Sequence, residues 1–196
     1  MTDSLPRAYF EDVYRAHRDP WSFETSPYET AKYDATLAAL PRAHYRDGFE
    51  IGCSIGVLTK RLAPICDWLL AVDTVAGVLD EAKRRCQRFP QVRFQQMAAP
   101  DEFPDQSFDL IIMSEVGYYF SETKLKEARE RIIAALETGG HLLLIHWTPF
   151  VPDYPLTGDQ VHEAFLAVAR AGSGGPLLHL RGQRAETYRL DVFERR

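Results

Sequence analysis

Two glycines and two carboxylates in the first half of the chain have types and spacings that could bind a nucleoside. Glu50, Gly52 and Gly56 form the run "EIGCSIG", in which an acidic residue precedes glycines four positions apart. Asp73 ends the apolar run "LLAVD", 21 residues after Gly52 (73 − 52). A carboxylate at this spacing accepts hydrogen bonds from ribose hydroxyls in nucleoside-binding folds. The alternative role for Asp73 is to cap a helix that starts near Val75.

The residues around the glycines distinguish three kinds of ligand. A P-loop for nucleotide phosphates requires Gly-Lys-Ser/Thr at the helix start, whereas Gly56 is followed by Val57 and Leu58. A dinucleotide fingerprint would place Ser54 and Val57 at its second and third glycine positions, where both side chains are too bulky. The carboxylate of Glu50 would repel a pyrophosphate but attract an ammonium group. The turn therefore favours a cationic nucleoside without phosphate, such as S-adenosylmethionine.

Alternating helices and strands must position this turn. Apolar periodicity predicts helices over 5–17, 26–40, 56–65, 76–89, 122–136 and 159–170, and strands over 48–52, 67–73, 91–96, 108–116 and 139–147. Because most of these strands are continuous apolar runs, we expect an α/β protein whose parallel sheet is covered on both faces. After a flexible stretch at 171–175, the segments 176–182 and 186–194 predict a β-hairpin. A ligand in such a sheet lies beyond the carboxyl ends of the strands.

Composition narrows the class of protein further. The chain has 196 residues, enough for one domain over 1–196, and its net charge of -5 predicts no affinity for nucleic acid. Cys53, Cys66 and Cys86 form no CxxC pair, which favours a reducing cytoplasm. No apolar run reaches the about 18 residues of a membrane span. Because His, Cys and carboxylate residues show no metal-ligand spacing, we expect no metal ion.

The segments around the turn resemble class I S-adenosylmethionine-dependent methyltransferases, and more narrowly the nodulation protein S group. The resemblance lies in "GFEIGCSIGVLTKRLAPICDWLLAVD", "FDLIIMSEVGYYF", "GGHLLLIHWTP" and "YPLTGDQVHEAF", and it covers most of the chain. It implies a Rossmann-like, mostly parallel seven-stranded sheet that ends in an antiparallel hairpin, with helices on both faces. The namesake members N-methylate the amine of a deacetylated chitooligosaccharide, although relatives with this signature need not share that acceptor.

The resemblance also divides the chain and assigns its residues. It implies an N-terminal helical lid over 1–44, a cofactor-binding core over 45–148, and an acceptor loop, helix and hairpin over 149–196. The residues expected to contact S-adenosylmethionine are Glu50, Gly52, Cys53, Ser54, Gly56, Asp73, Thr74, Gln96, Met97, Ala98, Ser114 and Tyr33. The residues expected to line the acceptor pocket are Tyr28, Tyr118, Tyr119, Trp147, Asp153 and Tyr154. Ordinary core packing is the alternative for Met97 and for the aromatic residues.

Glu115 and His146 are the candidate catalytic residues, because each ends a strand at the ligand edge of the sheet. Methyl transfer is an in-line displacement at a sulfonium, so alignment of the reactants supplies much of the rate. An amine acceptor must also present a free lone pair, and a carboxylate such as Glu115 can take its proton. His146 is a second candidate base or a hydrogen-bonding group for the acceptor. Structural roles are the alternative for both residues.

We therefore expect a cytoplasmic S-adenosylmethionine-dependent methyltransferase that acts on a small-molecule acceptor. The first candidate acceptor is an amine nitrogen in an amino sugar or a chitooligosaccharide-like compound. We expect a monomer or a homodimer with no nucleic-acid or membrane partner. Two alternatives remain open: an O-methyltransferase or other natural-product tailoring methyltransferase, and a non-catalytic S-adenosylmethionine-binding protein. A dehydrogenase is a remote alternative, which failure to bind NAD would dismiss.

Overall fold

The protein alternates helices with strands as its sequence predicts. The structure is a computed structural model that describes residues 3–169 and 174–196. The helices are α1 (Arg7–Ala16), α2 (Pro27–Ala39), α3 (Val57–Leu62), α4 (Ala76–Arg85), α5 (Glu122–Ala135) and α6 (Gly158–Ala169), with short 3-10 helices η1 (Ala63–Ile65) and η2 (Gly117–Tyr119). The strands are β1 (Tyr45–Ile51), β2 (Cys66–Asp73), β3 (Val92–Gln96), β4 (Phe108–Ser114), β5 (Leu136–Trp147), β6 (Leu177–Arg184) and β7 (Tyr188–Arg195).

The seven strands form one sheet in the order β3-β2-β1-β4-β5-β7-β6. Strands β1 to β5 pair in parallel, whereas β7 runs antiparallel to both β5 and β6. The predictions of a mostly parallel sheet and of a C-terminal hairpin are therefore confirmed. The strand order reverses between β1 and β4, so ligands are expected at the carboxyl ends of these two strands.

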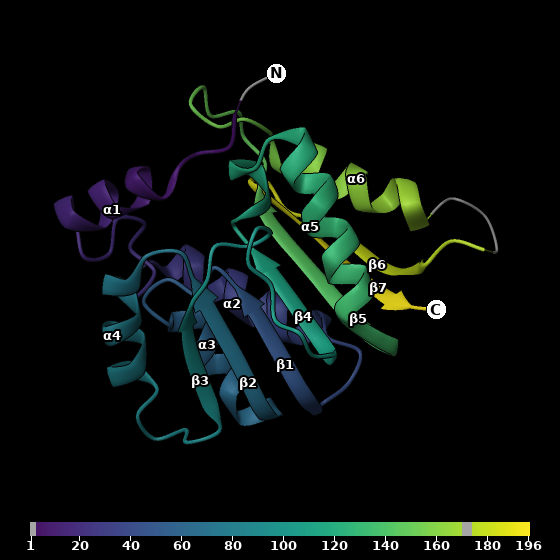
Figure 1. The fold of residues 1–196 in the computed structure, drawn as a ribbon, viewed down its shortest axis with the longest axis horizontal. Helices are drawn as coiled ribbons and strands as arrows, with labels where there is room; N and C mark the ends of the chain where they lie inside the picture. Colours follow the sequence, from purple (N-terminus) through teal and green to yellow (C-terminus); the bar gives the residue numbers. More distant parts are fainter. Residues whose placement is uncertain (1–2, 170–173) are drawn as a thin grey trace.

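Helices cover both faces of the sheet, and the alternation of side chains along β4 shows how. Ile111 and Met113 belong to one buried cluster, which they share with residues of α5 and α6. Leu110 and Ile112 point the other way, into a cluster with residues of α2 and α3. Figure 1 shows α5 and α6 in front of the sheet, α2 and α3 behind it, and α1 beyond the carboxyl ends of the strands.

Side-chain caps fix the starts of two of these helices. The Ser26 hydroxyl accepts from the backbone N–H of Glu29 at the start of α2, and Pro27 occupies the first turn. Ser121 caps α5 in the same way. Strand β4 ends at Ser114, two residues earlier than predicted, because Glu115 has φ 58° and turns the chain out of the sheet. The predicted end of the last helix at 170 and most of the predicted flexible stretch lie outside the described residues.

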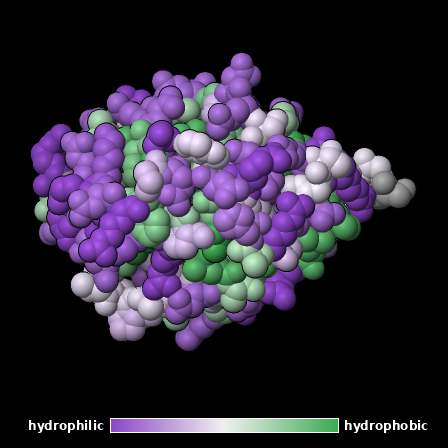
Figure 2. All heavy atoms as spheres, turned by 90° about the horizontal axis from the view of Figure 1, so that it is seen from below, coloured by the Kyte–Doolittle hydropathy of each residue, from purple (hydrophilic) through white to green (hydrophobic). Residues whose placement is uncertain are grey.

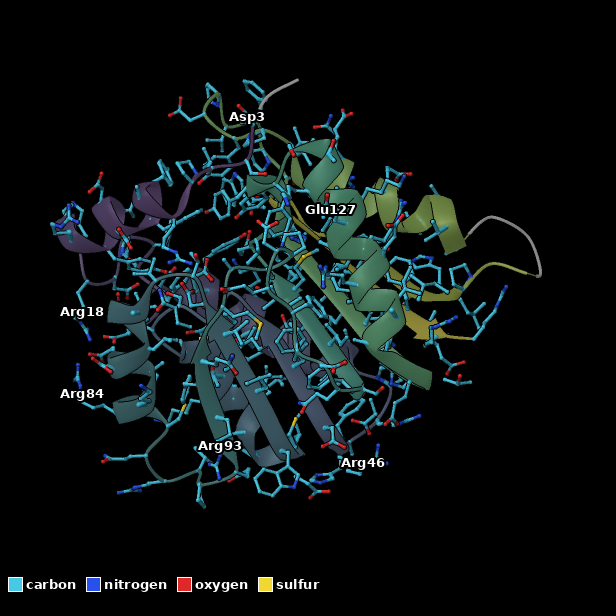
Figure 3. All side chains as sticks on the ribbon, viewed as in Figure 1. Asp3, Arg18, Arg46, Arg84, Arg93 and Glu127 are labelled. Atoms are coloured by element: carbon cyan, nitrogen blue, oxygen red, sulfur yellow. The ribbon has the colours of Figure 1, made fainter. Side chains whose placement is uncertain are left out.

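The surface is polar over most of the face seen from below, with smaller hydrophobic areas (Figure 2). The labelled arginines at positions 18, 46, 84 and 93 lie at the rim of the molecule (Figure 3). Within residues 3–169 and 174–196, no helix is both long and apolar enough to cross a membrane.

Candidate ligand site at the carboxyl edge of the sheet

A cavity of about 880 Å³ lies at the carboxyl ends of β1, β2 and β4, where the strand order reverses. Its volume is near the upper end of the roughly 300–1,000 Å³ typical of small-molecule sites. The wall on the sheet side includes Gly52, Asp73 and Glu115, and the wall on the solvent side includes residues of the N-terminal segment and α1. The cavity therefore lies where the sequence predicts a ligand.

The glycines of "EIGCSIG" are required by the shape of the turn. Gly52 has φ 77°, and a Cβ there would come within 2.3 Å of Cγ2 of Val116. Gly56 has φ 78°, and a Cβ there would come within 2.9 Å of Ala82 in α4. Larger residues at either position would strain the backbone and collide with a neighbouring element. Gly52 thus lets the turn pass close to the strand end beside it, and Gly56 lets α4 pack against the start of α3.

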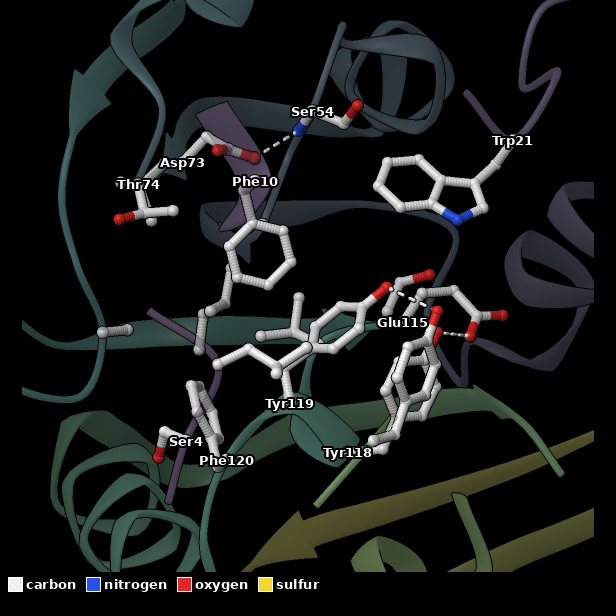
Figure 4. Close-up of a pocket in the computed structure, with 18 of the residues that line it drawn as sticks. Ser4, Phe10, Trp21, Ser54, Asp73, Thr74, Glu115, Tyr118, Tyr119 and Phe120 are labelled. Carbon is white, nitrogen blue, oxygen red and sulfur yellow. Dashed lines mark hydrogen bonds between the residues drawn. The ribbon is translucent and has the colours of Figure 1, made fainter. Parts of the chain in front are cut away.

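Asp73 links the turn to the loop after β2. Its Oδ2 accepts from the backbone N–H of Ser54 at 2.9 Å, and its Oδ1 accepts from the N–H of Val75 at 2.9 Å (Figure 4). Burial raises the pKa of this carboxyl to about 6, although these amides oppose the shift. The backbone amide of Thr74 opposes the shift as well, so that of about four acceptor positions on the carboxylate about one remains for a ligand. Asp73 therefore combines a structural role close to the predicted helix cap with a place in the cavity wall.

The next residues form the end of the cavity beside β2 and β3. Thr74 accepts a hydrogen bond at Oγ1 from Nε of Arg7, at 3.2 Å. Met97 and Ala98 line the cavity, but the backbone N–H of Ala98 already donates to a Glu102 oxygen at 2.7 Å. An apolar surface with few free polar groups is suited to a flat ring such as adenine.

The N-terminal segment closes the solvent side of the cavity. The backbone N–H of Leu5 donates to the carbonyl of Tyr119 at 2.9 Å, and the hydroxyl of Tyr14 donates to Oγ of Ser54 at 2.5 Å. The ring of Phe10 stands edge-on against Tyr119, with 4.9 Å between ring centroids. Figure 4 shows Phe10 and Tyr119 between Asp73 and Glu115. Helix α1 thus contributes to the cavity wall, and the lid over 1–44 stays a prediction.

Glu115 is the centre of a buried polar group at the other end of the cavity. Its Oε1 accepts from Nζ of Lys32 at 2.7 Å. Its Oε2 accepts from the hydroxyl of Tyr118 at 2.6 Å and from the backbone N–H of Trp147 at 2.9 Å. Lys32 also contacts Oε1 of Glu29 at 2.9 Å. Burial disfavours the charge of Lys32, but the two carboxylates outweigh burial and raise its pKa above the ordinary value.

Aromatic rings form the wall next to Glu115. Tyr118 stacks on Tyr154 with 5.0 Å between centroids, and Tyr119 meets Tyr154 edge-on at 4.8 Å. Tyr28 meets Trp147 edge-on at 6.0 Å. These rings pack against one another and also line the cavity, so core packing and ligand contact are not exclusive alternatives here.

His146 lies behind this wall, in a buried chain of hydrogen bonds. The backbone N–H of Gly117 donates to Nε2 of His146 at 3.1 Å, and Nδ1 of His146 lies 3.1 Å from Nε2 of His162. Nδ1 of His162 lies 2.6 Å from Oδ2 of Asp191, which also contacts His179 through Oδ1. Because Nε2 of His146 must accept, we assign its proton to Nδ1, and the same logic places the His162 proton on Nδ1. Burial lowers the pKa of both histidines, which agrees with two neutral rings.

The cavity includes most of the residues that the sequence singles out. Those that line it are Gly52, Ser54, Asp73, Thr74, Met97, Ala98, Ser114, Glu115, Tyr28, Tyr118, Tyr119, Trp147 and Tyr154. Glu50, Cys53 and Tyr33 instead line a small void of about 30 Å³. Gly56, Gln96, His146 and Asp153 are outside the linings of both. The structure thus gives His146 a place in the protein interior rather than in the acceptor pocket.

Glu50 is the predicted cofactor residue whose position differs most from expectation. It is fully buried, and Oε2 accepts from the Thr59 hydroxyl at 2.6 Å. Burial raises its pKa to about 8, Thr59 opposes the shift, and the charge of Asp73 adds to it. One oxygen of Glu50 thus contacts α3, and the expected contact with a ligand ammonium stays a prediction.

Two buried charged residues in the cavity wall, Glu29 and Lys32, were not predicted. Glu29 and Lys32 lie one turn apart on α2, on the face that also buries Tyr33 and Thr36. The sequence signal that could have found them is the occurrence of charged and apolar residues on one face of α2. A Glu and a Lys three residues apart usually form an exposed pair on a helix, so this signal is weak. Among the residues that the structure describes, no group of three or more His, Cys, Asp or Glu is arranged to hold a metal ion.

Comparisons by family model and by sequence both match this chain to nodulation protein S. The family model for nodulation protein S matches residues 11–146. Nodulation protein S of Rhizobium tropici is 28% identical over 127 residues, which are 64% of this chain and 53% of that protein. This chain therefore spans only about half the length of that curated relative.

Two solved structures share the fold. A structure described as a putative methyltransferase from Pseudomonas syringae is 36% identical, with a TM-score of 0.73, and the match covers 86% of this chain and 99% of that one. N-methyltransferase NodS from Bradyrhizobium japonicum WM9, solved with S-adenosyl-L-homocysteine, is 22% identical with a TM-score of 0.80, covering 95% and 97%. The sheet order and these matches show the class I methyltransferase fold.

Proposed function

This chain belongs to the nodulation protein S family, and from that premise we propose that it is an S-adenosylmethionine-dependent methyltransferase. The observation that carries the proposal is the position of Asp73, which ends β2 and lines the cavity beside the Gly52 turn. Asp73 would accept from the ribose hydroxyls, and Met97 with Phe10 would cover the adenine.

The cofactor, when bound, supplies an electrophilic methyl group on a sulfonium. The chain would contribute alignment, because the strand ends and α1 line one cavity that could hold both reactants. An amine acceptor must lose a proton before its lone pair can attack. Glu115 lines the cavity and has three hydrogen-bond donors for about four acceptor positions, so we propose that it accepts this proton. We propose for His146 a positioning role, in which it holds the backbone of Gly117.

We propose an amine nitrogen of an amino sugar or chitooligosaccharide-like compound as the acceptor. The name of the structural relative N-methyltransferase NodS supports a nitrogen acceptor. The aromatic rings beside Glu115 support a sugar, because aromatic faces stack on sugar rings. The cavity is also large enough to take an acceptor beside a nucleoside.

Calorimetric titration with S-adenosyl-L-homocysteine, with NAD as the parallel control, tests the cofactor. We expect micromolar binding of the former alone, and a loss of about tenfold or more in Asp73→Asn, because a charged hydrogen-bond partner contributes about 1.5–3 kcal/mol. Folded protein that binds neither compound would refute the proposal. Binding without methyl transfer to amines, hydroxyls or chitosan oligomers would instead favour a non-catalytic binder, and transfer to hydroxyls alone an O-methyltransferase.

A further inference from the structure

A group of charged side chains joins α4 to the connection between α1 and α2. We call Arg18, Glu24, Glu81 and Arg85 the outer network. Glu24 accepts from Arg18 and from Nη2 of Arg85. An oxygen of Glu81 lies 3.0 Å from Nη1 of Arg18 and 3.4 Å from Nη2 of Arg85. None of these four residues belongs to the lining of the cavity or of the small void, so the outer network reaches the site only through other residues.

Arg85 is the member of the outer network that holds the glycine turn. It ends α4, and its Nε donates to the carbonyl oxygen of Ile55 at 2.8 Å. Ile55 lies between two residues with positive φ, Ser54 at 50° and Gly56 at 78°. A serine with positive φ is strained and persists only where its surroundings fix the backbone. Asp73 holds the N–H of Ser54 and Arg85 holds the carbonyl of Ile55, so the turn is fixed from both sides.

Glu24 links Arg85 to aromatic rings in the cavity wall. Asp19 accepts from the backbone N–H of Phe23 at 2.8 Å and from that of Glu24 at 3.0 Å, which fixes the shape of this stretch. The ring of Phe23 stacks on Trp21 with 5.5 Å between centroids, and both rings line the cavity. One guanidinium thus contacts the glycine turn and also the stretch that carries these two rings.

An arginine is well suited to this double contact. Its planar guanidinium donates from Nε to Ile55 and from Nη2 to Glu24 in one fixed geometry. The side chains of Arg85 and Glu24 are 17% and 23% exposed, so water screens their contact less than it screens an exposed pair. Hydrogen bonds from Arg18 and Arg85 lower the pKa of Glu24, which therefore stays ionised at neutral pH. A lysine carries the same charge as a compact group on a flexible stem and lacks this geometry.

We infer that Arg85 is a positioning residue for the cofactor, which holds the glycine turn and the Trp21–Phe23 stretch in one arrangement around the ligand. Because the turn and the two rings border the proposed cofactor site, this role rests on the proposed function. Arg85 acts through the carbonyl of Ile55 and the carboxylate of Glu24, without touching the ligand.

Arg85→Ala and Arg85→Lys test this role in calorimetric titrations with S-adenosyl-L-homocysteine, with urea unfolding of the same samples. We expect Arg85→Ala to bind about tenfold more weakly or worse, because it loses two charged hydrogen bonds. Arg85→Lys should bind about fivefold more weakly or worse, although it keeps the charge. Arg84→Ala is the matched control, because Arg84 precedes Arg85 on α4, is 71% exposed and also pairs with Glu81. Its affinity should stay within about twofold of the wild type.

Affinity and stability together separate positioning from a purely structural role. A purely structural Arg85 would lower the urea midpoint of Arg85→Lys but leave the affinity of the folded variant within about twofold of the wild type, and that result would overturn the inference. Equal weakening in Arg84→Ala and Arg85→Ala would also overturn it, since the cause would then be the charge of α4 rather than the contacts of one guanidinium. Arg85→Lys carries the test if Arg85→Ala does not fold.

Glu24→Gln tests the link to the aromatic rings, since it removes the charge and leaves Arg85 in contact with Ile55. We expect a loss of about three- to fivefold in affinity, the size of a partly buried ion pair. The double variant with Arg85→Ala should bind as Arg85→Ala does, because both changes break the same link. Losses that multiply in the double variant, or an unchanged affinity in Glu24→Gln, would overturn this coupling. A wild type that binds no S-adenosyl-L-homocysteine would instead refute the proposed function itself.

Discussion

Replacing Glu50 by glutamine should change how the stability of the protein depends on pH. Burial raises the pKa of Glu50 to about 8, from an ordinary value of 4.5. The folded protein therefore holds this proton more tightly than the unfolded chain does. Its contribution to stability is complete below about pH 4.5 and is lost as the pH rises through about 8.

The size of this loss follows from the two pKa values. Between pH 5 and pH 7 the single site removes about 2–3 kcal/mol of unfolding free energy, at about 1.4 kcal/mol for each pKa unit. The amide of Glu50→Gln does not ionise, and its oxygen can still accept from the Thr59 hydroxyl. The variant should therefore gain about 2–3 kcal/mol relative to the wild type over the same pH interval.

Urea unfolding followed by circular dichroism at pH 5, 6, 7 and 8 measures the effect without any ligand. Asp73 titrates in an overlapping range, since its pKa is raised to about 6. The relevant quantity is therefore the difference between variant and wild type at each pH. Asp34→Asn, an exposed carboxyl, should show no such trend. A Glu50→Gln difference that stays constant within about 0.5 kcal/mol would refute the assignment of Glu50 as a buried, protonated acid.

Three further predictions concern the turn, the histidine chain and the lid. Gly52→Ala should weaken binding of S-adenosyl-L-homocysteine at least tenfold in calorimetry. The reason is that its Cβ would come within 2.3 Å of a methyl group of Val116, at a residue whose φ is 77°. Gly77→Ala is the control, because its Cβ would meet no atom within 4 Å, and it should bind normally. Equal affinities would contradict this account of the turn. His162→Ala should lower the unfolding free energy by about 2–4 kcal/mol, because it leaves buried partners without hydrogen bonds, while the exposed His44→Ala should cost under about 0.5 kcal/mol. Similar urea midpoints for the two would argue against the histidine chain. Tyr14→Phe should speed release of S-adenosyl-L-homocysteine several-fold in stopped-flow measurements, since it removes the hydrogen bond from α1 to Ser54 in the glycine turn. An unchanged release rate would show that α1 does not hold the ligand.

Much of the fold is predictable because its strands are marked by strong local signals. The continuous apolar run of β4 is typical of a strand buried on both faces, and the two neighbouring strand-like segments β6 and β7 indicate a hairpin. The glycines of the first turn are equally informative, because the turn needs the positive φ of Gly52 and Gly56, which glycine adopts most readily. These features depend on residues close together in the sequence.

The parts that were missed depend on residues far apart in the sequence. Lys32 is buried only because Glu115, 83 positions later, provides a partner. His146 meets His162 and Asp191 only after β7 has paired with β5. Glu115 leaves the predicted strand through a positive φ, which no residue preference indicates for a glutamate. Such contacts arise from tertiary packing, and local patterns carry little information about them.

The histidine chain also limits how this protein can be redesigned. It joins Gly117, which begins the η2 turn with Tyr118 and Tyr119, to Asp191 in the C-terminal hairpin through the two rings of His146 and His162. The loop between β5 and α6, which carries Tyr154, begins and ends next to these two rings. A graft of that loop from a relative with another acceptor would therefore have to bring the matching residues of α6 and β7 with it. The exchangeable unit is the entire C-terminal third of the chain, and its boundary lies within β5.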